Sequence, residues 1–240
     1  MKVAILADVH GNAAALEAVI ADLETVRPDR VLVNGDLLAF GPEPEETAAL
    51  LRRLGAPSTR GNTDRWLVEV ALGEASGVPE GDVRDSLGWT VERMPATELR
   101  ALRELPFSLS ADPLPVVLYH ASAAGDDEGV WPTTPDGDVP GLFAGAPHAT
   151  LVVSHTHRAG ERRAGGVRVL NTGSVGLPYD GDPRAAYLVL QGDDAGGRGA
   201  DVHAEWRRVE YDRERTLGAL RDRAVPMAAR LALRIRTGEY

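Results

Sequence analysis

The first 65 residues alternate between short apolar runs and stretches whose apolar residues recur at helical spacing. Residues 3–7 and 30–34 have the composition of strands that are buried on both faces. Residues 13–23 and 45–54 place apolar side chains three and four positions apart, which predicts two helices. A shorter strand is predicted at 56–60. The order strand, helix, strand over these lengths predicts right-handed βαβ units and parallel strand pairs.

Residues 65–105 have a different pattern. Charged residues and glycine alternate with Leu, Val and Trp at roughly helical spacing, and no strand-like run interrupts them. We therefore expect two or three helices, one containing 87–93 and another 96–105. The interpretation is that 65–105 is a helical insertion, or cap, within a single domain that spans 1–240. Trp66 is expected to be a core aromatic of this piece.

Strand-like runs return in the second half of the chain. The segment 124–140 is rich in Gly, Asp and Pro, and its one large side chain is Trp131. Because a loop this long is usually functional, we expect the segment to face a substrate. A turn is predicted at 193–199, before the last strand. Residues 212–237 have a helical pattern that Pro226 interrupts. The strands are predicted at 115–119, 149–153, 167–170, 185–190 and 201–210.

Composition narrows the possible functions. The chain of 240 residues has a formal net charge of −10, which argues against a general nucleic-acid-coating role, although metal ions could still supply local positive charge to a phosphoester enzyme. It contains no cysteine, so disulfides, zinc–thiolate sites and thiol nucleophiles are excluded. The chain begins directly with a strand-like run, so we expect no signal peptide, and no apolar run approaches the roughly 20 residues of a membrane span. We expect a cytoplasmic protein with no membrane partner.

Potential metal ligands follow five of the predicted strands. Taken singly, each has an ordinary explanation: Asp8 can cap a turn, His120 can lie beside one, and Asn62 can form an Asx turn. Asp8 and His10 are one residue apart, so an extended backbone would direct both side chains to the same side. Together the ligands offer oxygen and nitrogen without sulfur, enough for two divalent ions of the Mn, Fe, Zn or Co type. They are Asp8, His10, Asp36, Asn62, His120, His155 and His157.

The order of these motifs resembles the calcineurin-like metallophosphoesterases, and within them the small YfcE-like phosphodiesterases of bacteria and archaea. The match extends over nearly the whole chain. The resemblance implies an α/β fold of four layers, an α/β/β/α sandwich in which two mixed sheets are flanked by helices. The motifs that carry it are Asp8-Val9-His10, Gly35-Asp36, Gly61-Asn62, His120, Ser154-His155-Thr156-His157, Asn171-Thr172-Gly173-Ser174-Val175-Gly176 and Asp180-Gly181-Asp182-Pro183-Arg184.

The resemblance also implies which residues bind which metal ion. Each of two metal ions would have three ligands of its own, and one carboxylate would bridge the two ions, because a carboxylate has two oxygens. The ligands would be Asp8, His10 and His157 for one ion, Asn62, His120 and His155 for the other, and Asp36 for both. The residues expected to be catalytic are Asp36, His10 and Asn62.

The implied reaction is hydrolysis of a small phosphodiester by attack of a metal-bridging hydroxide on phosphorus, without a phosphoenzyme. Manganese is the metal expected first, with Fe, Zn, Co, Ni or Mg as alternatives. Such a pair of ions lowers the pKa of a shared water and stabilises the attacking and leaving oxygens of an in-line displacement.

Two positions depart from the pattern of many relatives. Thr63 follows Gly61-Asn62 where they have a histidine that protonates the leaving group, and threonine cannot replace such an acid near neutral pH. Tyr179 stands where they often have arginine. Thr63, Asn12 and Arg184 are weak candidates for substrate binding; Asn12 can instead cap the first helix, and Arg184 can pair with a nearby aspartate. Asp64 could orient a histidine ligand or be an exposed helix cap.

Three other functions stay open at this point. A phosphomonoesterase, protein phosphatase or dinucleotide-polyphosphate hydrolase is disfavoured by Thr63 and the acidic composition, and a nuclease by the lack of a basic groove. A non-catalytic scaffold of the same fold would not need seven metal-binding side chains. The amphipathic helical tail is expected to pack on the core, with a face for homo-oligomer formation as the alternative.

Overall fold

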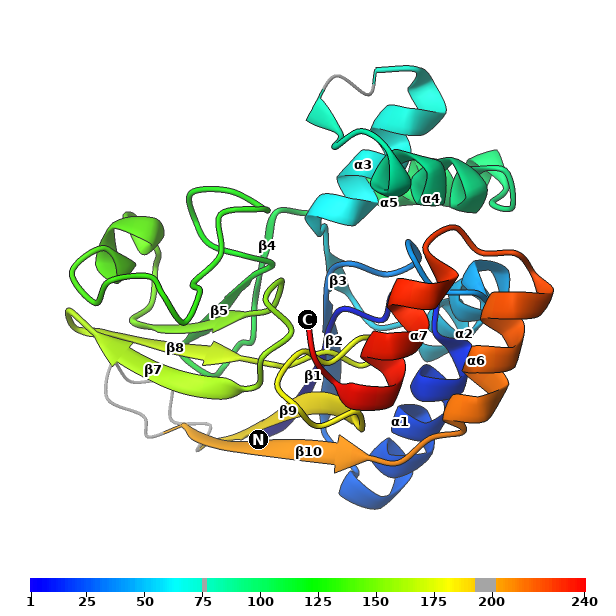
Figure 1. The fold of residues 1–240 in the computed structure, drawn as a ribbon. Coiled ribbons are helices and arrows are strands. Elements are labelled where there is room, and N and C mark those ends of the chain that lie inside the picture. Colours follow the sequence, from blue (N-terminus) through cyan, green and yellow to red (C-terminus); the bar gives the residue numbers. More distant parts are fainter. Residues whose placement is uncertain (75–76, 193–201) are drawn as a thin grey trace.

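The computed structural model describes residues 1–74, 77–192 and 202–240. The chain forms two five-stranded mixed sheets (Figure 1). The first has the strand order β10-β9-β1-β2-β3, in which β1, β2 and β3 are parallel and β9 and β10 complete the sheet in antiparallel pairs. Its strands are β1 (Lys2–Leu6), β2 (Arg30–Asn34), β3 (Ser58–Thr59), β9 (Ala185–Gln191) and β10 (His203–Val209).

The second sheet has the order β4-β5-β6-β8-β7, with a parallel centre of β5, β6 and β8 and antiparallel edges. The predicted strands at 115–119, 149–153 and 167–170 are confirmed. The sequence pattern missed the two edges, because β4 has three residues and β7 reads Gly-Glu-Arg-Arg-Ala, without a run of apolar residues. The strands are β4 (Ser108–Ser110), β5 (Val116–Tyr119), β6 (Thr150–Val153), β7 (Gly160–Ala164) and β8 (Val167–Asn171).

A hydrophobic core joins the two sheets. Ile5 and Leu32 of the first sheet belong to the same buried cluster as Leu118 and Val152 of the second. Because side chains alternate along a strand, Leu6 of β1 belongs instead to the cluster on the outer, helical side. Both faces of β1 are therefore buried, as its apolar sequence predicts.

Helices cover the outer face of the first sheet, and the segment 121–148 covers the outer face of the second (Figure 1). That segment contains a 3-10 helix, η2 (Val139–Phe143), whose Val139 and Phe143 pack against β5, β6 and β8. The predicted α/β architecture of two mixed sheets flanked by helices is confirmed. The covering helices are α1 (Ala13–Val26) and α2 (Pro44–Leu54), while α6 (Arg213–Asp222) packs beside α1 and α7 (Ala228–Thr237) packs on α6 and on Leu177 and Tyr179.

Three further helices occupy most of residues 62–103, as the pattern predicts. α3 (Asn62–Leu72), α4 (Asp82–Val91) and α5 (Ala96–Arg103) pack on one another and lie at the top in Figure 1. That they form an insertion within one domain stays a prediction. The turn predicted at 193–199 lies outside the described residues. Among the described helices, none has the length and apolar character needed to cross a membrane.

Candidate metal centre

The predicted ligands lie together where strands of both sheets end. Asp8 and His10 follow β1, Asp36 follows β2, and His157 follows β6. One ligand atom from each of these four side chains lies within 4.8 Å of all the others, and all four residues are buried. The structure therefore brings together four side chains that follow three of the predicted strands, and those strands belong to the two sheets that the resemblance implies.

The other three predicted ligands lie beside this cluster. The amide oxygen of Asn62 is 3.2 Å from Nε2 of His120 and 3.0 Å from Nδ1 of His155. Oδ2 of Asp36 is 3.5 Å from Nε2 of His10 and also 3.5 Å from Nε2 of His120. The Asp36 carboxylate therefore lies between the two groups of ligands, which is the place that a bridging ligand would occupy.

Unusual backbone geometry aims these side chains. Asp8 and His10 have φ of 51° and 49°, in the left-handed region that costs an ordinary residue about 1–2 kcal/mol. The expectation that an extended backbone directs both to one side is therefore wrong; they lie in a loop after β1. Hydrogen bonds hold this loop, because the Asp8 and His10 N–H groups donate to the carbonyls of Gly35 and Asp36 at 3.0 Å. Left-handed φ also occurs at Asp36, His155 and His157 (56°, 64° and 56°).

Asp64 stabilises the loop that carries Asp36. Its carboxylate accepts hydrogen bonds from the backbone N–H of Asp36 at 2.9 Å, of Leu37 at 3.0 Å and of Gly61 at 2.9 Å. Burial, with the nearby Asp36 charge, raises the pKa of Asp64 to about 7. The expected bond to a histidine is wrong, because the hydrogen bonds of Asp64 go to backbone N–H groups. Asp64 does help to cap α3, since it accepts from the N-cap residue Gly61, but it is fully buried and not exposed as expected.

Three histidines have their ring orientation fixed by backbone carbonyls. Nδ1 of His10, His120 and His157 each lies against a carbonyl oxygen, so Nδ1 carries a proton in all three rings, and in the neutral rings of His10 and His157 Nε2 offers its lone pair to the centre. The Nε2 atoms of His10 and His157 are only 3.2 Å apart. Two lone pairs this close repel unless a cation or a proton lies between them. The carbonyls belong to Ala39, Asn34 and Leu177, at 3.0, 2.7 and 2.5 Å respectively.

Burial keeps most of the imidazoles neutral. It lowers the pKa of His155 to about 4, and it lowers the pKa of His10 and of His157 as well. A neutral imidazole is the form that binds a metal ion. These three rings are therefore available as ligands near neutral pH.

The carboxylates of Asp8 and Asp36 are buried, so their ionised forms need positive charge nearby. Burial raises the pKa of Asp8, and neither of its oxygens has a hydrogen-bond partner among the described residues. Burial alone would raise the pKa of Asp36, but His120 and His10 lower it. Burial alone would lower the pKa of His120, yet Asp36 and Asp8 raise it to about 10. A buried carboxylate without a partner is costly, so this donor set fits divalent cations.

The three weak candidates for substrate binding have different places. Asn12 is buried and caps α1, where Oδ1 accepts from the backbone of Ala15 at 3.1 Å. Arg184 lies outside the cavity described below and pairs with Asp182 at 2.6 Å. Thr63 lines that cavity, and its backbone N–H donates to Oδ1 of Asp36 at 3.0 Å. The structure therefore brings only Thr63 to the site.

A cavity of about 260 Å³ adjoins the cluster, and part of its wall was not expected from the sequence. Helix α7 and the residues after it supply Arg230, Arg234 and Tyr240. Tyr179 also lines the cavity and stacks on the His157 ring, with centroids 4.4 Å apart and planes 10° apart. The two arginines could not be recognised from the sequence, because an arginine pair four residues apart is ordinary on an exposed helix face.

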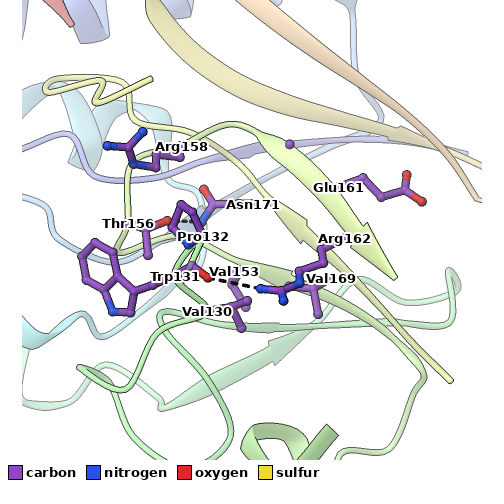
Figure 2. A pocket seen from close by; sticks show the side chains of 11 residues that line it. Val130, Trp131, Pro132, Val153, Thr156, Arg158, Glu161, Arg162, Val169 and Asn171 are labelled. Atoms are coloured by element: carbon purple, nitrogen blue, oxygen red, sulfur yellow. Dashed lines mark hydrogen bonds between the residues drawn. The ribbon is translucent and has the colours of Figure 1, made fainter. Parts of the chain in front are cut away.

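Trp131 separates this cavity from a second one on the outer face of the second sheet. Its indole meets the His155 ring edge-on, with centroids 5.7 Å apart, and it lines both cavities. Figure 2 shows the second cavity, with Arg158 and Trp131 on one side and Arg162 on the other. That the segment 124–140 faces a substrate stays a prediction. Trp66, expected in the core, packs on the core and also lines the first cavity.

The sequence and the structure of this chain both resemble those of known proteins. Residues 1–195 match the family described as the calcineurin-like phosphoesterase superfamily domain. An uncharacterized protein of Methanocaldococcus jannaschii, MJ0912, is 26% identical over 231 residues, which is 88% of each chain. The crystal structure of a metallophosphoesterase from Sphaerobacter thermophilus matches with a TM-score of 0.75 and 26% identity, covering 99% of this chain and 100% of that one. The hypothetical protein PH1004 of Pyrococcus horikoshii has the same fold, with a TM-score of 0.83, 19% identity, and coverage of 99% and 98%.

Proposed function

Because the chain belongs to the calcineurin-like phosphoesterase superfamily, we propose that it is a dinuclear metal-dependent phosphodiesterase acting on small phosphodiesters. The superfamily supports a phosphoester hydrolase with a divalent metal site. The number of ions, the preference for diesters and the role of each residue are the proposal. The observation that carries it is the buried Asp8, His10, Asp36 and His157 cluster, whose ligand atoms lie within 4.8 Å of one another.

The ligands would divide between two ions. Asp8, His10 and His157 would hold one, Asn62, His120 and His155 the other, and Asp36 would bridge them. The two unpartnered oxygens of Asp8 and the facing Nε2 atoms of His10 and His157 are the features that fit such ions. When bound, divalent ions would supply Lewis acidity for activating water and for neutralising phosphate charge. Manganese is the first choice of metal, because the carboxylate and amide oxygens of this set suit it.

The residues around the centre favour a substrate with a good leaving group. Thr63 lines the cavity at the position where a proton-donating histidine would stand, and a threonine hydroxyl does not protonate a leaving oxygen near neutral pH. Phe40, Trp66 and Trp131 give the same cavity aromatic walls. Aryl esters combine a stable leaving group with a ring that can pack on these walls.

The proposal is tested by comparing two aryl substrates. The chain is treated with a chelator, and hydrolysis of bis-p-nitrophenyl phosphate and p-nitrophenyl phosphate is measured before and after Mn²⁺ is restored. We expect turnover only with metal, and a higher kcat/KM for the diester. A monoester preference would contradict the diesterase assignment in favour of a phosphatase. Unchanged activity in chelator would contradict the metal dependence itself.

A further inference from the structure

Arg234 of α7 reaches the proposed metal centre from a distant part of the chain. Its side chain lines the same cavity as His10, Asp36 and His157. Its positive charge is close enough to contribute to lowering the pKa of His10, after burial. A guanidinium is therefore available beside the ligands, although none of the metal-binding motifs contains an arginine.

The charge of Arg234 is not neutralised by a carboxylate among the described residues. Its one hydrogen bond there runs from Nη1 to the Tyr179 hydroxyl at 3.1 Å, and its Nε is buried without a partner. Arg230, which lines the same cavity, differs because it approaches Asp82 at 3.5 Å. In a chain with a formal charge of −10, a half-buried arginine without an acidic partner is unusual and costly. An anion in the cavity would offset that cost.

Two aromatic rings hold the guanidinium in place. It lies over Tyr179 and Tyr240, 5.0 Å and 4.7 Å from their ring centroids, and the two rings meet edge-on at 5.1 Å. Tyr179 is fixed in turn by stacking on His157. The chain after α7 is anchored because Gly238 accepts a hydrogen bond from the Gly181 N–H at 2.8 Å. Because Nη1 donates to Tyr179 and Nε is buried, Nη2 is the part of the guanidinium that this packing leaves for an anion.

We propose that Arg234 binds the phosphoryl oxygens of the substrate, with Tyr179 and Tyr240 as the residues that position it. This inference rests on the proposed function, because it assigns a group to the same site. It also accounts for two departures of the sequence. Tyr179 replaces an arginine that relatives often have, and α7 supplies a guanidinium beside that tyrosine. Thr63 removes one source of positive charge near the phosphate, and Arg234 provides another.

The ligand class that follows is an anionic phosphoester whose non-bridging oxygens accept charge-assisted hydrogen bonds. Arginine suits this task better than lysine, since its planar fork can meet two oxygens at once. A guanidinium is not a general acid near neutral pH, so this group binds and stabilises charge but does not protonate the leaving group. Arg234 therefore replaces the electrostatic part of the histidine's role and not its acid part.

The test compares Arg234→Gln and Arg234→Lys with Arg236→Gln, a change at an exposed arginine on the same helix. Binding of inorganic phosphate to the Mn²⁺-loaded full chain is measured by calorimetry, alongside kcat and KM for bis-p-nitrophenyl phosphate. Loss of a charge-assisted hydrogen bond predicts about 10- to 100-fold weaker phosphate binding and a raised KM in Arg234→Gln. Arg234→Lys should show a smaller loss, and Arg236→Gln should match the wild type.

Equal phosphate affinity in wild type and Arg234→Gln would overturn the assignment, as would an equal loss in Arg236→Gln. Circular dichroism and Mn²⁺ content show whether a variant is folded and loaded with metal. If Arg234→Gln is unfolded or lacks metal, phosphate binding is compared between the wild type and Arg234→Lys. Absence of wild-type turnover would contradict the proposed function. The phosphate comparison would still decide the role of Arg234, so the two failures are distinguishable.

Discussion

Replacing Asp36 by Asn is expected to lower kcat/KM for phosphoester hydrolysis by more than about 100-fold, while the chain stays folded. Replacing a residue that only orients a metal ligand typically lowers metal affinity or activity by about 10–100-fold. Loss of a carboxylate that lies between the two groups of ligands should lower activity further. The fold should persist because an asparagine retains Oδ1, which accepts the Thr63 N–H at 3.0 Å. Turnover is measured with saturating Mn²⁺, and folding by circular dichroism.

Asp182→Asn is the matched control for this change. The chemical change, from carboxylate to amide, is the same as at Asp36. Asp182, however, pairs with Arg184 and lies outside the cavity. We expect its kcat/KM to stay close to the wild-type value. Activity retained in Asp36→Asn, or lost to the same extent in both variants, would contradict the bridging role of Asp36.

Gly41→Ala is expected to destabilise the protein by about 3 kcal/mol or more and to reduce hydrolysis. A Cβ at Gly41 would lie 1.8 Å from the backbone oxygen of His10 and 2.4 Å from the carbonyl carbon of Gly11. Both are backbone atoms, so a side-chain rotation cannot relieve the clash, and overpacking of this kind is costly. The loop that aims His10 would have to move. Urea denaturation gives the change in the free energy of unfolding.

Gly218→Ala in α6 serves as the comparison. Its Cβ would meet no atom closer than Nη2 of Arg221 at 3.9 Å, and alanine is favoured over glycine inside a helix by roughly 0.5–1 kcal/mol. This variant should be as stable as the wild type or slightly more stable, with unchanged hydrolysis. If the two alanine variants lost stability equally, close backbone packing at Gly41 would not be the cause.

The parts of the fold that follow from local patterns were predictable. β1 and β2 are apolar runs because both of their faces are buried, and α1 and α2 show apolar residues at helical spacing because one side covers a sheet. The carboxyl ends of parallel strands meet at one edge, so ligand motifs placed after those strands predicted a shared site. The family predicted from the motifs is confirmed by the match over residues 1–195.

The backbone of the site was not predictable in this way. Asp8 and His10 adopt left-handed φ because their N–H groups donate hydrogen bonds to carbonyls of the Gly35–Leu37 loop, which hold them there. Asp64 supports that loop by accepting hydrogen bonds from the backbone N–H groups of Asp36 and Leu37, which are remote from it in sequence. It accepts a third from Gly61, at the start of its own helix. Such contacts depend on the packed arrangement of loops, and a spacing rule for extended strands cannot supply them.

Arg234, which α7 contributes to the cavity, could not be predicted either, because its position depends on tertiary packing. Leu231 and Ile235 pack on the core, so the helix shows the amphipathic pattern of any covering helix. Which polar residues of its other side face solvent depends on where the helix docks. Arg236 is exposed, whereas Arg234 lies against Tyr179 and the cavity. Only the tertiary structure distinguishes the two arginines.

The most direct test of the central claim is a calorimetric titration of the chelator-treated wild-type chain with Mn²⁺, with hydrolysis of bis-p-nitrophenyl phosphate followed in the same samples. The buried Asp and His ligands predict saturable binding of two Mn²⁺ ions per chain, and hydrolysis that returns as the second site fills. Hydrolysis without bound metal, or the absence of saturable Mn²⁺ binding in a folded and active chain, would contradict the account.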